Sequence, residues 1–298
     1  MPKDSSPPPD RLQTTLALVQ MPCAPSYDAN LDHALGEIAR AASDGADVVC
    51  LPELFTMAYP CREEDHAQFT LAESIPGPTT TALASAAAEH QVVVVGSIFE
   101  RRAPGVYHNA AVVIERNGSI VGHYRKTHIP DDPGYYEKFY FAPGDLGFPV
   151  CPTSAGNLGI AICWDQWFPE VARLLALAGA EIIFYPTAIG WLQEEKATRG
   201  ASQQAAWRTM MQSHSIANGL FVAAVNRVGI EGQIEFWGGS FVADPYGVVI
   251  SQASDPACPE RIMAECDRSH IEAARTHWPF LRDRRIDTYD GLLRRFLD

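Results

Sequence analysis

Three polar residues of this chain have the side-chain types needed to attack a carbonyl or nitrile carbon. Glu53, Lys126 and Cys163 each follow a run of strand-forming residues. A carboxylate can remove the proton of a thiol, and the resulting thiolate is a strong nucleophile. An ammonium group and a backbone N–H, such as that of Trp164, can stabilise the oxyanion that forms. The three residues together predict a hydrolase that works through a covalent thioester.

Each of these residues also has a plainer interpretation. A free cysteine is most often a small buried hydrophobe, whereas a glutamate or lysine at a strand end is usually solvated. The surroundings favour the catalytic interpretation. Leu51 and Leu54 flank Glu53, and a charge is costly in apolar surroundings unless it is paired. Cys163 precedes a helix expected to begin near Pro169, and a helix N-terminus favours a thiolate.

The elements that must position these residues follow from hydrophobic periodicity. Apolar runs predict strands at 14–20, 47–51, 91–99, 107–115, 119–125, 158–162, 181–185, 220–225, 238–242, 248–251 and 261–265. Helical spacing predicts helices at 30–42, 79–90, 169–179, 202–218 and 269–277. Turn signals at 116–118 and 244–247 indicate two hairpins. Hairpins within a β-α alternation predict an α/β fold with mixed sheets and helices on the outer faces.

The sequence predicts one domain with two flanking segments. Residues 1–12 are rich in proline and serine and are expected to form a disordered lead-in. Residues 13–277 form the expected single domain. Residues 278–298 are rich in arginine and aromatic residues and are interpreted as an arm that packs on a partner subunit.

Composition excludes several classes of protein. The net charge of -13 argues against nucleic acid or an anionic membrane as partner, and no run is long and apolar enough to span a bilayer. The seven cysteines show no CxxC spacing, which predicts a reduced, cytoplasmic setting without a disulfide framework. His128 lacks an HxH or HExxH partner, and no nucleotide-binding glycine motif occurs. The sequence therefore gives no support for a metal site or a nucleotide-binding site.

Taken in order, the windows around Glu53, Lys126 and Cys163 resemble those of the nitrilase (carbon–nitrogen hydrolase) superfamily. The resemblance covers nearly everything from residue 14 to about 289. It implies a Glu-Lys-Cys triad at these three positions and a four-layer α-β-β-α sandwich. It also implies a homodimer or higher homo-oligomer and no cofactor. Residues 108–109 correspond to a stretch that supports the triad in this family.

Three further stretches, 128–141, 163–170 and 185–190, resemble the N-carbamoylputrescine amidohydrolases of that superfamily. Those enzymes convert N-carbamoylputrescine and water to putrescine, carbon dioxide and ammonia. The resemblance implies that Glu137 is a second glutamate that orients the triad. The residues expected to contact the carbamoyl substrate are Tyr59, Tyr136, Asp165, Gln166, Trp167, Thr187, Ala188 and Glu194.

One departure leaves the far end of the substrate open. Many of these enzymes place a glutamate, thought to bind the distal ammonium, where this chain has Leu192. Glu194 or Glu195 can replace it from a shifted loop, or the substrate can carry another tail. A β-ureido acid, an N-carbamoyl amino acid or an ω-amide would need a cation such as Arg173 or Arg208. An inactive binding protein on the same fold is the alternative outside enzymes.

Overall fold

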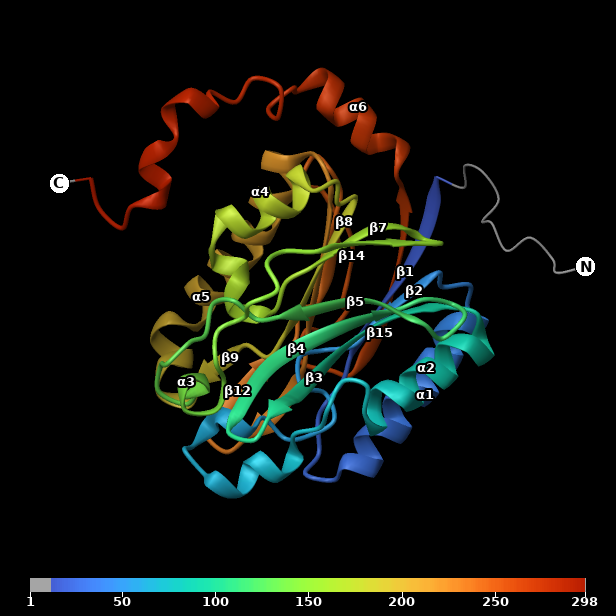
Figure 1. Ribbon diagram of the computed structural model, residues 1–298, viewed down its shortest axis with the longest axis vertical. Coiled ribbons are helices and arrows are strands. Elements are labelled where there is room, and N and C mark those ends of the chain that lie inside the picture. Colours follow the sequence, from blue (N-terminus) through green and yellow to red (C-terminus); the bar gives the residue numbers. More distant parts are fainter. Residues whose placement is uncertain (1–11, 298) are drawn as a thin grey trace, which may run out of the picture.

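Two six-stranded mixed sheets form the centre of the protein in a computed structural model that describes residues 12–297 (Figure 1). The first sheet has the order β15-β1-β2-β3-β4-β5. Its strands are β1 (Gln13–Gln20), β2 (Val48–Cys50), β3 (Val93–Ala103), β4 (Val106–Ile114), β5 (Ile120–Arg125) and β15 (Glu260–Asp267). β2 is parallel to β1 and β3, and the other pairs are antiparallel. The predicted β4–β5 hairpin is confirmed.

The second sheet has the order β14-β13-β10-β8-β7-β6. Its strands are β6 (Val150–Thr153), β7 (Gly156–Ile160), β8 (Ile182–Thr187), β10 (Phe221–Asn226), β13 (Phe241–Ala243) and β14 (Val249–Gln252). β8 is parallel to its neighbours β7 and β10. β13 and β14 form the second predicted hairpin, which is also confirmed.

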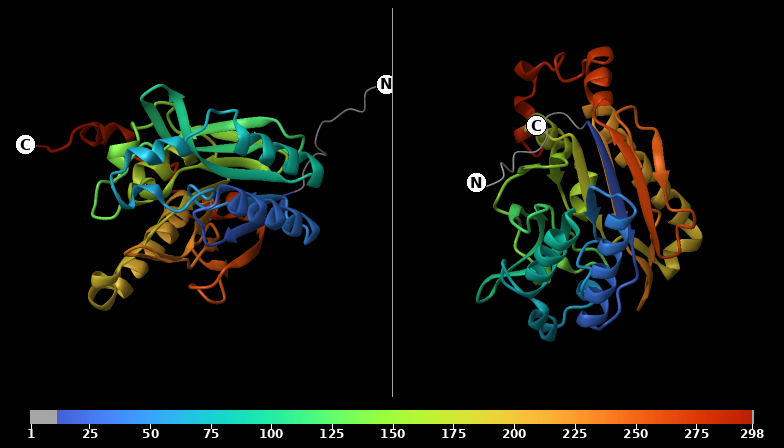
Figure 2. Two further views of the ribbon diagram at one scale, coloured as in Figure 1. Left: turned by 90° about the horizontal axis from the view of Figure 1, so that it is seen from below. Right: turned by 90° about the vertical axis from the view of Figure 1, so that its right-hand side faces the viewer.

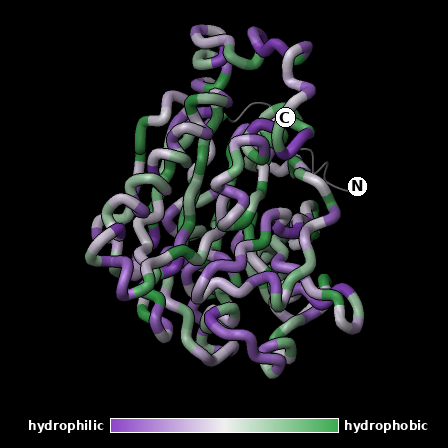
Figure 3. Tube along the Cα trace, turned by 90° about the vertical axis from the view of Figure 1, so that its left-hand side faces the viewer, coloured by the Kyte–Doolittle hydropathy of each residue, from purple (hydrophilic) through white to green (hydrophobic). Residues whose placement is uncertain are grey.

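Helices cover the outer faces of both sheets (Figure 2). α1 (Tyr27–Ser43) and α2 (Pro78–His90) pack on the first sheet through an apolar layer that includes Ile38 and Leu83. α4 (Pro169–Leu177) and α5 (Gln193–Asn218) pack on the second sheet through a layer that includes Leu175 and Trp207. A third apolar layer joins the sheets, and apolar stretches run through the middle of the molecule (Figure 3). The predicted α-β-β-α sandwich is therefore confirmed.

Local sequence signals account for the helix ends. The Ser26 hydroxyl accepts a hydrogen bond from the Ala29 N–H, as expected of a helix N-cap. α5 stops at Gly219, whose φ of 57° is the left-handed conformation that glycine adopts at low cost. α6 (Ser269–His277) matches its predicted bounds.

Several short elements were not predicted. β9 (Gly190–Leu192), β12 (Ile234–Trp237) and β11 (Val228–Glu231) form a small antiparallel sheet. α5 begins at Gln193, although helical spacing predicted a start at residue 202. The remaining short helices are η1 (Pro60–Arg62), η2 (His66–Leu71), α3 (Glu137–Tyr140), η3 (Cys163–Trp167), η4 (Ile286–Thr288) and η5 (Asp290–Leu293).

The segment after α6 lies outside the sandwich. Beyond α6, residues 278–297 extend away from the body and carry η4 and η5 (Figures 1 and 2). The lead-in expected at 1–12 falls outside the described residues except for Leu12, which is exposed. Within residues 12–297 there is no helix with the length and apolarity that crossing a membrane requires.

Candidate active site

Four buried side chains meet near the ends of the central strands. Glu53 lies shortly after β2, Lys126 directly after β5, and Cys163 at the start of η3, after β7. Glu137 is the first residue of α3. The side chains of Glu53, Lys126 and Glu137 are inaccessible to solvent, and Cys163 is 5% exposed. The sandwich thus brings together residues from both sheets and from the loop after β5.

Lys126 is the centre of a hydrogen-bonded network. Its Nζ lies 2.8 Å from Glu53 Oε1, and 2.8 and 2.7 Å from the two carboxylate oxygens of Glu137. Asn109 Nδ2 donates to Glu53 Oε1 at 2.6 Å, and the Tyr59 hydroxyl donates to Glu137 Oε1 at 2.6 Å. Glu53 Oε2 is buried and has no partner among the described residues. One carboxylate oxygen of Glu53 is therefore free to accept a proton.

The charges of the network shift the proton affinities of its members. Burial raises the pKa of the Cys163 thiol well above its usual range; the Glu53 charge adds to this effect and Lys126 opposes it. Burial by itself lowers the pKa of Lys126, but the carboxylates of Glu137 and Glu53 outweigh it and raise that pKa. Burial raises the pKa of Glu137 to about 7, against the effect of Lys126. The resting site therefore holds a neutral thiol beside a charged ammonium.

Cys163 occupies a strained turn. Its φ of 43° is rare for a residue with a side chain and costs roughly 1–3 kcal/mol. The buried carboxylate of Asp165 holds this turn, because its Oδ2 accepts from the Ile162 N–H at 3.0 Å and from the Tyr124 hydroxyl at 2.7 Å. Its Oδ1 accepts from the His128 N–H at 2.9 Å. Asp165 therefore ties the nucleophile turn to the segment that carries Lys126.

A second strained turn carries Glu53. The next residue, Leu54, has a φ of 48°. The buried guanidinium of Arg227 donates to the carbonyl oxygens of Glu53 and Leu54 at 2.7 and 2.8 Å. Arg227 also pairs with Glu231 at 2.9 Å, and Glu231 accepts from the Tyr59 N–H at 2.5 Å. This buried ion pair fixes the segment that carries both Glu53 and Tyr59.

Cys163 opens into a cavity of about 430 Å³. Its walls come from the loop after β5, the nucleophile turn, β9, α5 and Trp237. The charged residues of the lining are Asp132 and Glu195, and neither an arginine nor a lysine belongs to it. The cavity can thus hold a small neutral or cationic molecule against the Cys163 thiol, with the Glu53–Lys126–Glu137 network buried behind that thiol. No cluster of three His, Cys, Asp or Glu side chains suited to a metal occurs within residues 12–297.

A family model described as carbon–nitrogen hydrolase matches residues 15–276. The chain belongs to the carbon–nitrogen hydrolase family. The hydrolase is 40% identical to the N-carbamoylputrescine amidase of Solanum lycopersicum, with 94% of each chain covered. It is 38% identical to a citrullinase of Francisella tularensis subsp. tularensis, with 94% of this chain and 98% of the relative covered.

A solved structure supports the same assignment. The carbon–nitrogen hydrolase from Helicobacter pylori G27 is 44% identical, has a TM-score of 0.92, and aligns over 96% of this chain and 100% of its own. The resemblance to the nitrilase superfamily is confirmed, and the protein is a hydrolytic enzyme rather than an inactive binding protein.

Some residues predicted to contact substrate line the cavity of the hydrolase. Trp167 and Ala188 do so beside Cys163. Trp164, whose backbone N–H is expected to bind the oxyanion, also lines the cavity. Glu194 is exposed and lies outside the lining, whereas its neighbour Glu195 is part of it. The expectation for Glu194 is corrected accordingly, because the helix geometry at the start of α5 turns the two side chains in different directions.

Four other predicted contacts lie behind the cavity wall. Asp165, Gln166 and Thr187 are fully buried and absent from the lining. Gln166 Oε1 accepts from Trp207 Nε1 at 2.8 Å and from the Thr187 hydroxyl at 3.4 Å. Tyr59 is also buried and binds Glu137. Their polar atoms support the residues that face the cavity, and direct contact of these four with substrate stays a prediction.

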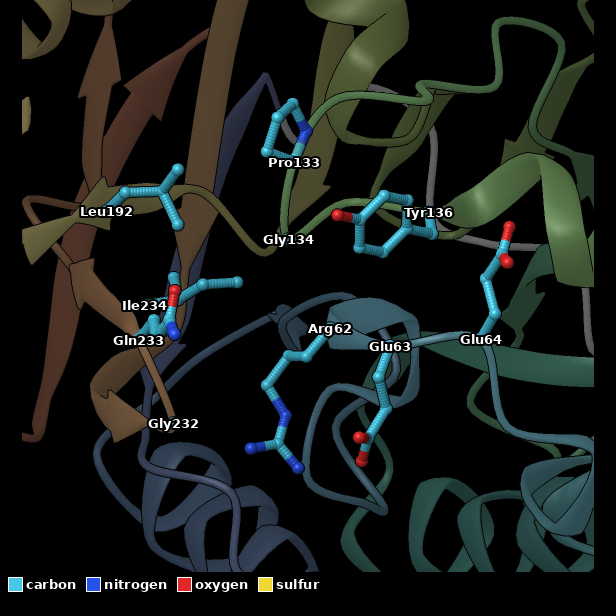
Figure 4. Close-up of a pocket in the computed structure, with 10 residues that line it drawn as sticks. All are labelled: Arg62, Glu63, Glu64, Pro133, Gly134, Tyr136, Leu192, Gly232, Gln233 and Ile234. Atoms are coloured by element: carbon cyan, nitrogen blue, oxygen red, sulfur yellow. The ribbon is translucent and has the colours of Figure 1, made fainter.

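Tyr136 faces a different hollow. It lines a cavity of about 620 Å³ together with Arg62, Glu63 and other residues of neighbouring loops (Figure 4). This second cavity shares Pro133 and Leu192 with the first. Leu192, which stands where a distal carboxylate was expected, is thus an apolar residue at the border of the two cavities.

Sequence reasoning missed several residues of the site. Tyr135, rather than Tyr136, lines the cavity with Cys163, and its hydroxyl is fixed by the backbone N–H and carbonyl of Gly190. Gln203 and Trp237 also line the cavity and carried no motif. Arg227 follows directly on the apolar run 220–225 and Asn226, and a charge at that place was the available signal.

Proposed function

We propose that the hydrolase cleaves N-carbamoylputrescine to putrescine, carbon dioxide and ammonia. The observation that carries this proposal is the pairing of Cys163 and the Glu53–Lys126–Glu137 network with a cavity whose charged lining is acidic only. Putrescine linked to a carbamoyl group keeps one free ammonium, which suits such a cavity. Amidases for this substrate from Solanum lycopersicum and Arabidopsis thaliana are 40% and 39% identical to the chain.

In the first step the Cys163 sulfur attacks the carbamoyl carbon while Glu53 takes the thiol proton. The negative charge that develops on the carbonyl oxygen is stabilised by Lys126 and by the Trp164 N–H. Glu53 then passes its proton to the departing nitrogen, so that putrescine leaves and a carbamoyl thioester remains on Cys163. Glu137 keeps Lys126 in place through two hydrogen bonds.

In the second step Glu53 removes a proton from water, and the hydroxide attacks the thioester carbon. The thiol of Cys163 leaves with the proton held by Glu53, and carbamic acid is released. Carbamic acid decomposes to carbon dioxide and ammonia. One water is consumed for each substrate, and neither electrons nor a cofactor are required.

Substrates with an anionic tail fit the cavity beside Cys163 less well. Arg173 donates to the carbonyl of Ala217 at 2.9 Å, and Arg208 donates to Gln252. Neither arginine lines the cavity, so a distal carboxylate would find no cation there. One of the relatives is a citrullinase. Citrulline, a ureido compound with an amino-acid end, is therefore the second candidate substrate.

Ammonia release tests the proposal. The wild type is expected to release ammonia from N-carbamoylputrescine faster than from citrulline or 4-ureidobutyrate. Cys163→Ala should lose at least about 10⁴-fold in kcat, because no other side chain can form the thioester. Equal release by the wild type and Cys163→Ala would refute the nucleophile assignment. A higher kcat/KM for citrulline would instead establish the second candidate.

We also propose that the protein is a cytoplasmic homodimer or higher homo-oligomer. Its seven cysteines are all free, and six of them are buried, which suits a reducing compartment. The segment after α6 exposes apolar side chains that a second copy could cover. Cell fractionation tests the location, and recovery in an extracellular fraction would contradict it.

A further inference from the structure

We infer that Glu195 and Gln203 on α5 form the site that binds the distal primary ammonium of the substrate. The inference rests on the proposed function and identifies the part of the cavity that binds the far end of the substrate. Glu195 lies in the first turn of α5, and Gln203 and Ala206 follow on the same face of the helix. All three line the cavity into which Cys163 opens.

Gln203 offers a hydrogen-bond acceptor that the protein leaves unused. Its Nε2 donates to Glu195 Oε2 at 3.2 Å. Its Oε1 is buried and has no partner among the described residues. Exchanging the amide atoms would set the amide oxygen against a carboxylate oxygen, so the present orientation is the favourable one. A buried acceptor without a donor is costly, and a ligand that donates a hydrogen bond removes this cost.

Glu195 offers a negative charge that no described side chain neutralises. Among residues 12–297 no ion pair includes Glu195. The adjacent Lys196 is turned to Glu235, with its Nζ 2.7 Å from both carboxylate oxygens. The N-terminal turn of α5 favours a carboxylate at this place. The cavity therefore keeps an unpaired carboxylate in contact with its interior.

These two acceptors together suit an ammonium group. An alkylammonium carries one positive charge and three N–H donors, and it accepts no hydrogen bond. Trp237, which is almost fully buried, supplies an aromatic wall in the same cavity. The indole nitrogens of Trp167 and Trp237 are buried donors without partners, but they are neutral and cannot offset a carboxylate placed beside Glu195.

Tyr135 lines the same cavity as Cys163 and Glu195. Burial raises the pKa of its hydroxyl, so this group stays protonated. Because Gly190 satisfies that hydroxyl, Tyr135 contributes an apolar ring rather than a competing polar group. A carbamoyl group at Cys163 and an ammonium at Glu195 would thus be joined by an alkyl chain that passes this ring.

Binding to an inactive enzyme separates this inference from the proposed function. Calorimetry on Cys163→Ala would compare N-carbamoylputrescine with N-butylurea, which has the same carbamoyl group and four-carbon chain but no ammonium. We expect the cationic ligand to bind at least about tenfold more tightly. Adding Glu195→Gln should reduce its affinity roughly tenfold to hundredfold and remove most of the preference. Adding Gln203→Met should reduce it several-fold.

Glu194→Gln in the same background is the matched comparison, since Glu194 is the neighbouring carboxylate outside the cavity. It should keep the preference for the cationic ligand. The inference is overturned if Cys163→Ala shows no such preference, or if Glu195→Gln keeps it. If the preference depends on Glu195 while the wild type releases no ammonia from N-carbamoylputrescine, the ammonium site stands and the proposed reaction fails.

Discussion

At the scale of single residues, the site depends on one ammonium shared by two carboxylates. Lys126 is within 2.8 Å of both Glu53 and Glu137, and all three side chains are fully buried. Two ionised carboxylates would leave this group with a net negative charge, which is unfavourable away from water. The hydrogen bonds from Tyr59 and Asn109 reduce that cost. The raised pKa of Glu137 reflects the same imbalance.

The titration of Glu137 is expected to shape the pH dependence of the reaction. Because burial raises its pKa to about 7, the carboxylate gains its proton as the pH falls through that value. Lys126 then loses one of its two anionic partners, so wild-type kcat/KM should fall from pH 8 to pH 5. Glu137→Gln should lower kcat/KM at pH 8 by roughly tenfold to hundredfold and remove the midpoint near 7.

A pH profile of kcat/KM checks this prediction. Lys138→Gln is the control, because Lys138 is the exposed neighbour on α3 and should keep the wild-type profile. An unchanged acidic limb in Glu137→Gln would assign the titration to another group.

The predicted roles of individual residues depended on where their side chains point. Glu53 and Cys163 could be found because each follows an apolar run, and Lys126 could be found because it directly follows a predicted hairpin strand. Asp165 could not be placed from its spacing to Cys163. The 3₁₀ turn, in which the Asp165 N–H donates to the Ile162 carbonyl at 3.0 Å, directs its carboxylate inward. Tertiary contacts with Tyr124 and His128 determine its role.

At the scale of elements, the hairpins and buried strands could be predicted, but the small sheet could not. β9, β11 and β12 have three or four residues each, which is too short for a periodic pattern. The first turns of α5 lack an apolar face because most of their residues are exposed. The small sheet and the first turns of α5 both border the cavity. The sequence therefore predicted least well the part of the protein where the far end of the substrate is proposed to bind.

The turn that carries Glu53 is held by another element, the end of β10. Arg227→Met would leave Glu231 buried without its partner and free three main-chain carbonyls, those of Glu53, Leu54 and Met57. We expect a loss of roughly 3–5 kcal/mol in the free energy of unfolding. Urea denaturation measures this quantity.

Two further variants make the Arg227 prediction specific. Arg40→Met removes an arginine that is 57% exposed and paired with Glu37, and should change the free energy of unfolding by less than about 1 kcal/mol. Combining Arg227→Met with Glu231→Gln should restore part of the lost stability, because the unpaired buried charge is gone. Additive losses in the double variant would show that the two side chains act independently.

At the scale of the whole molecule, catalysis depends on the packing of the two sheets. Lys126 and Glu53 follow strands of the first sheet, whereas Cys163 follows a strand of the second. The apolar layer between the sheets includes Cys163 itself, and Tyr124 of β5 reaches across it to Asp165. The site therefore exists only when the sandwich is complete, and a change in that layer should affect activity as well as stability.

The segment after α6 exposes apolar side chains that suit an interface between copies of the chain. Its apolar side chains are unusually exposed, with Leu293 at 94% and Phe296 at 74%. Monomeric proteins seldom leave such residues together in water, so we expect a second copy to cover them. Leu293→Ser combined with Phe296→Ser should lower the mass found by sedimentation equilibrium from that of a dimer or its multiple toward that of a monomer. Leu146→Ser is the control, at a site 43% exposed on the loop before β6, and it should leave this mass unchanged.

The free energy of unfolding distinguishes loss of association from loss of folding in these variants. Both side chains are exposed within one copy, so each substitution should cost the isolated fold less than about 0.5 kcal/mol. Any larger loss of stability should therefore depend on protein concentration, because it would come from the lost interface. A wild type that sediments as a monomer, or a double variant with unchanged mass, would show that this segment does not join subunits.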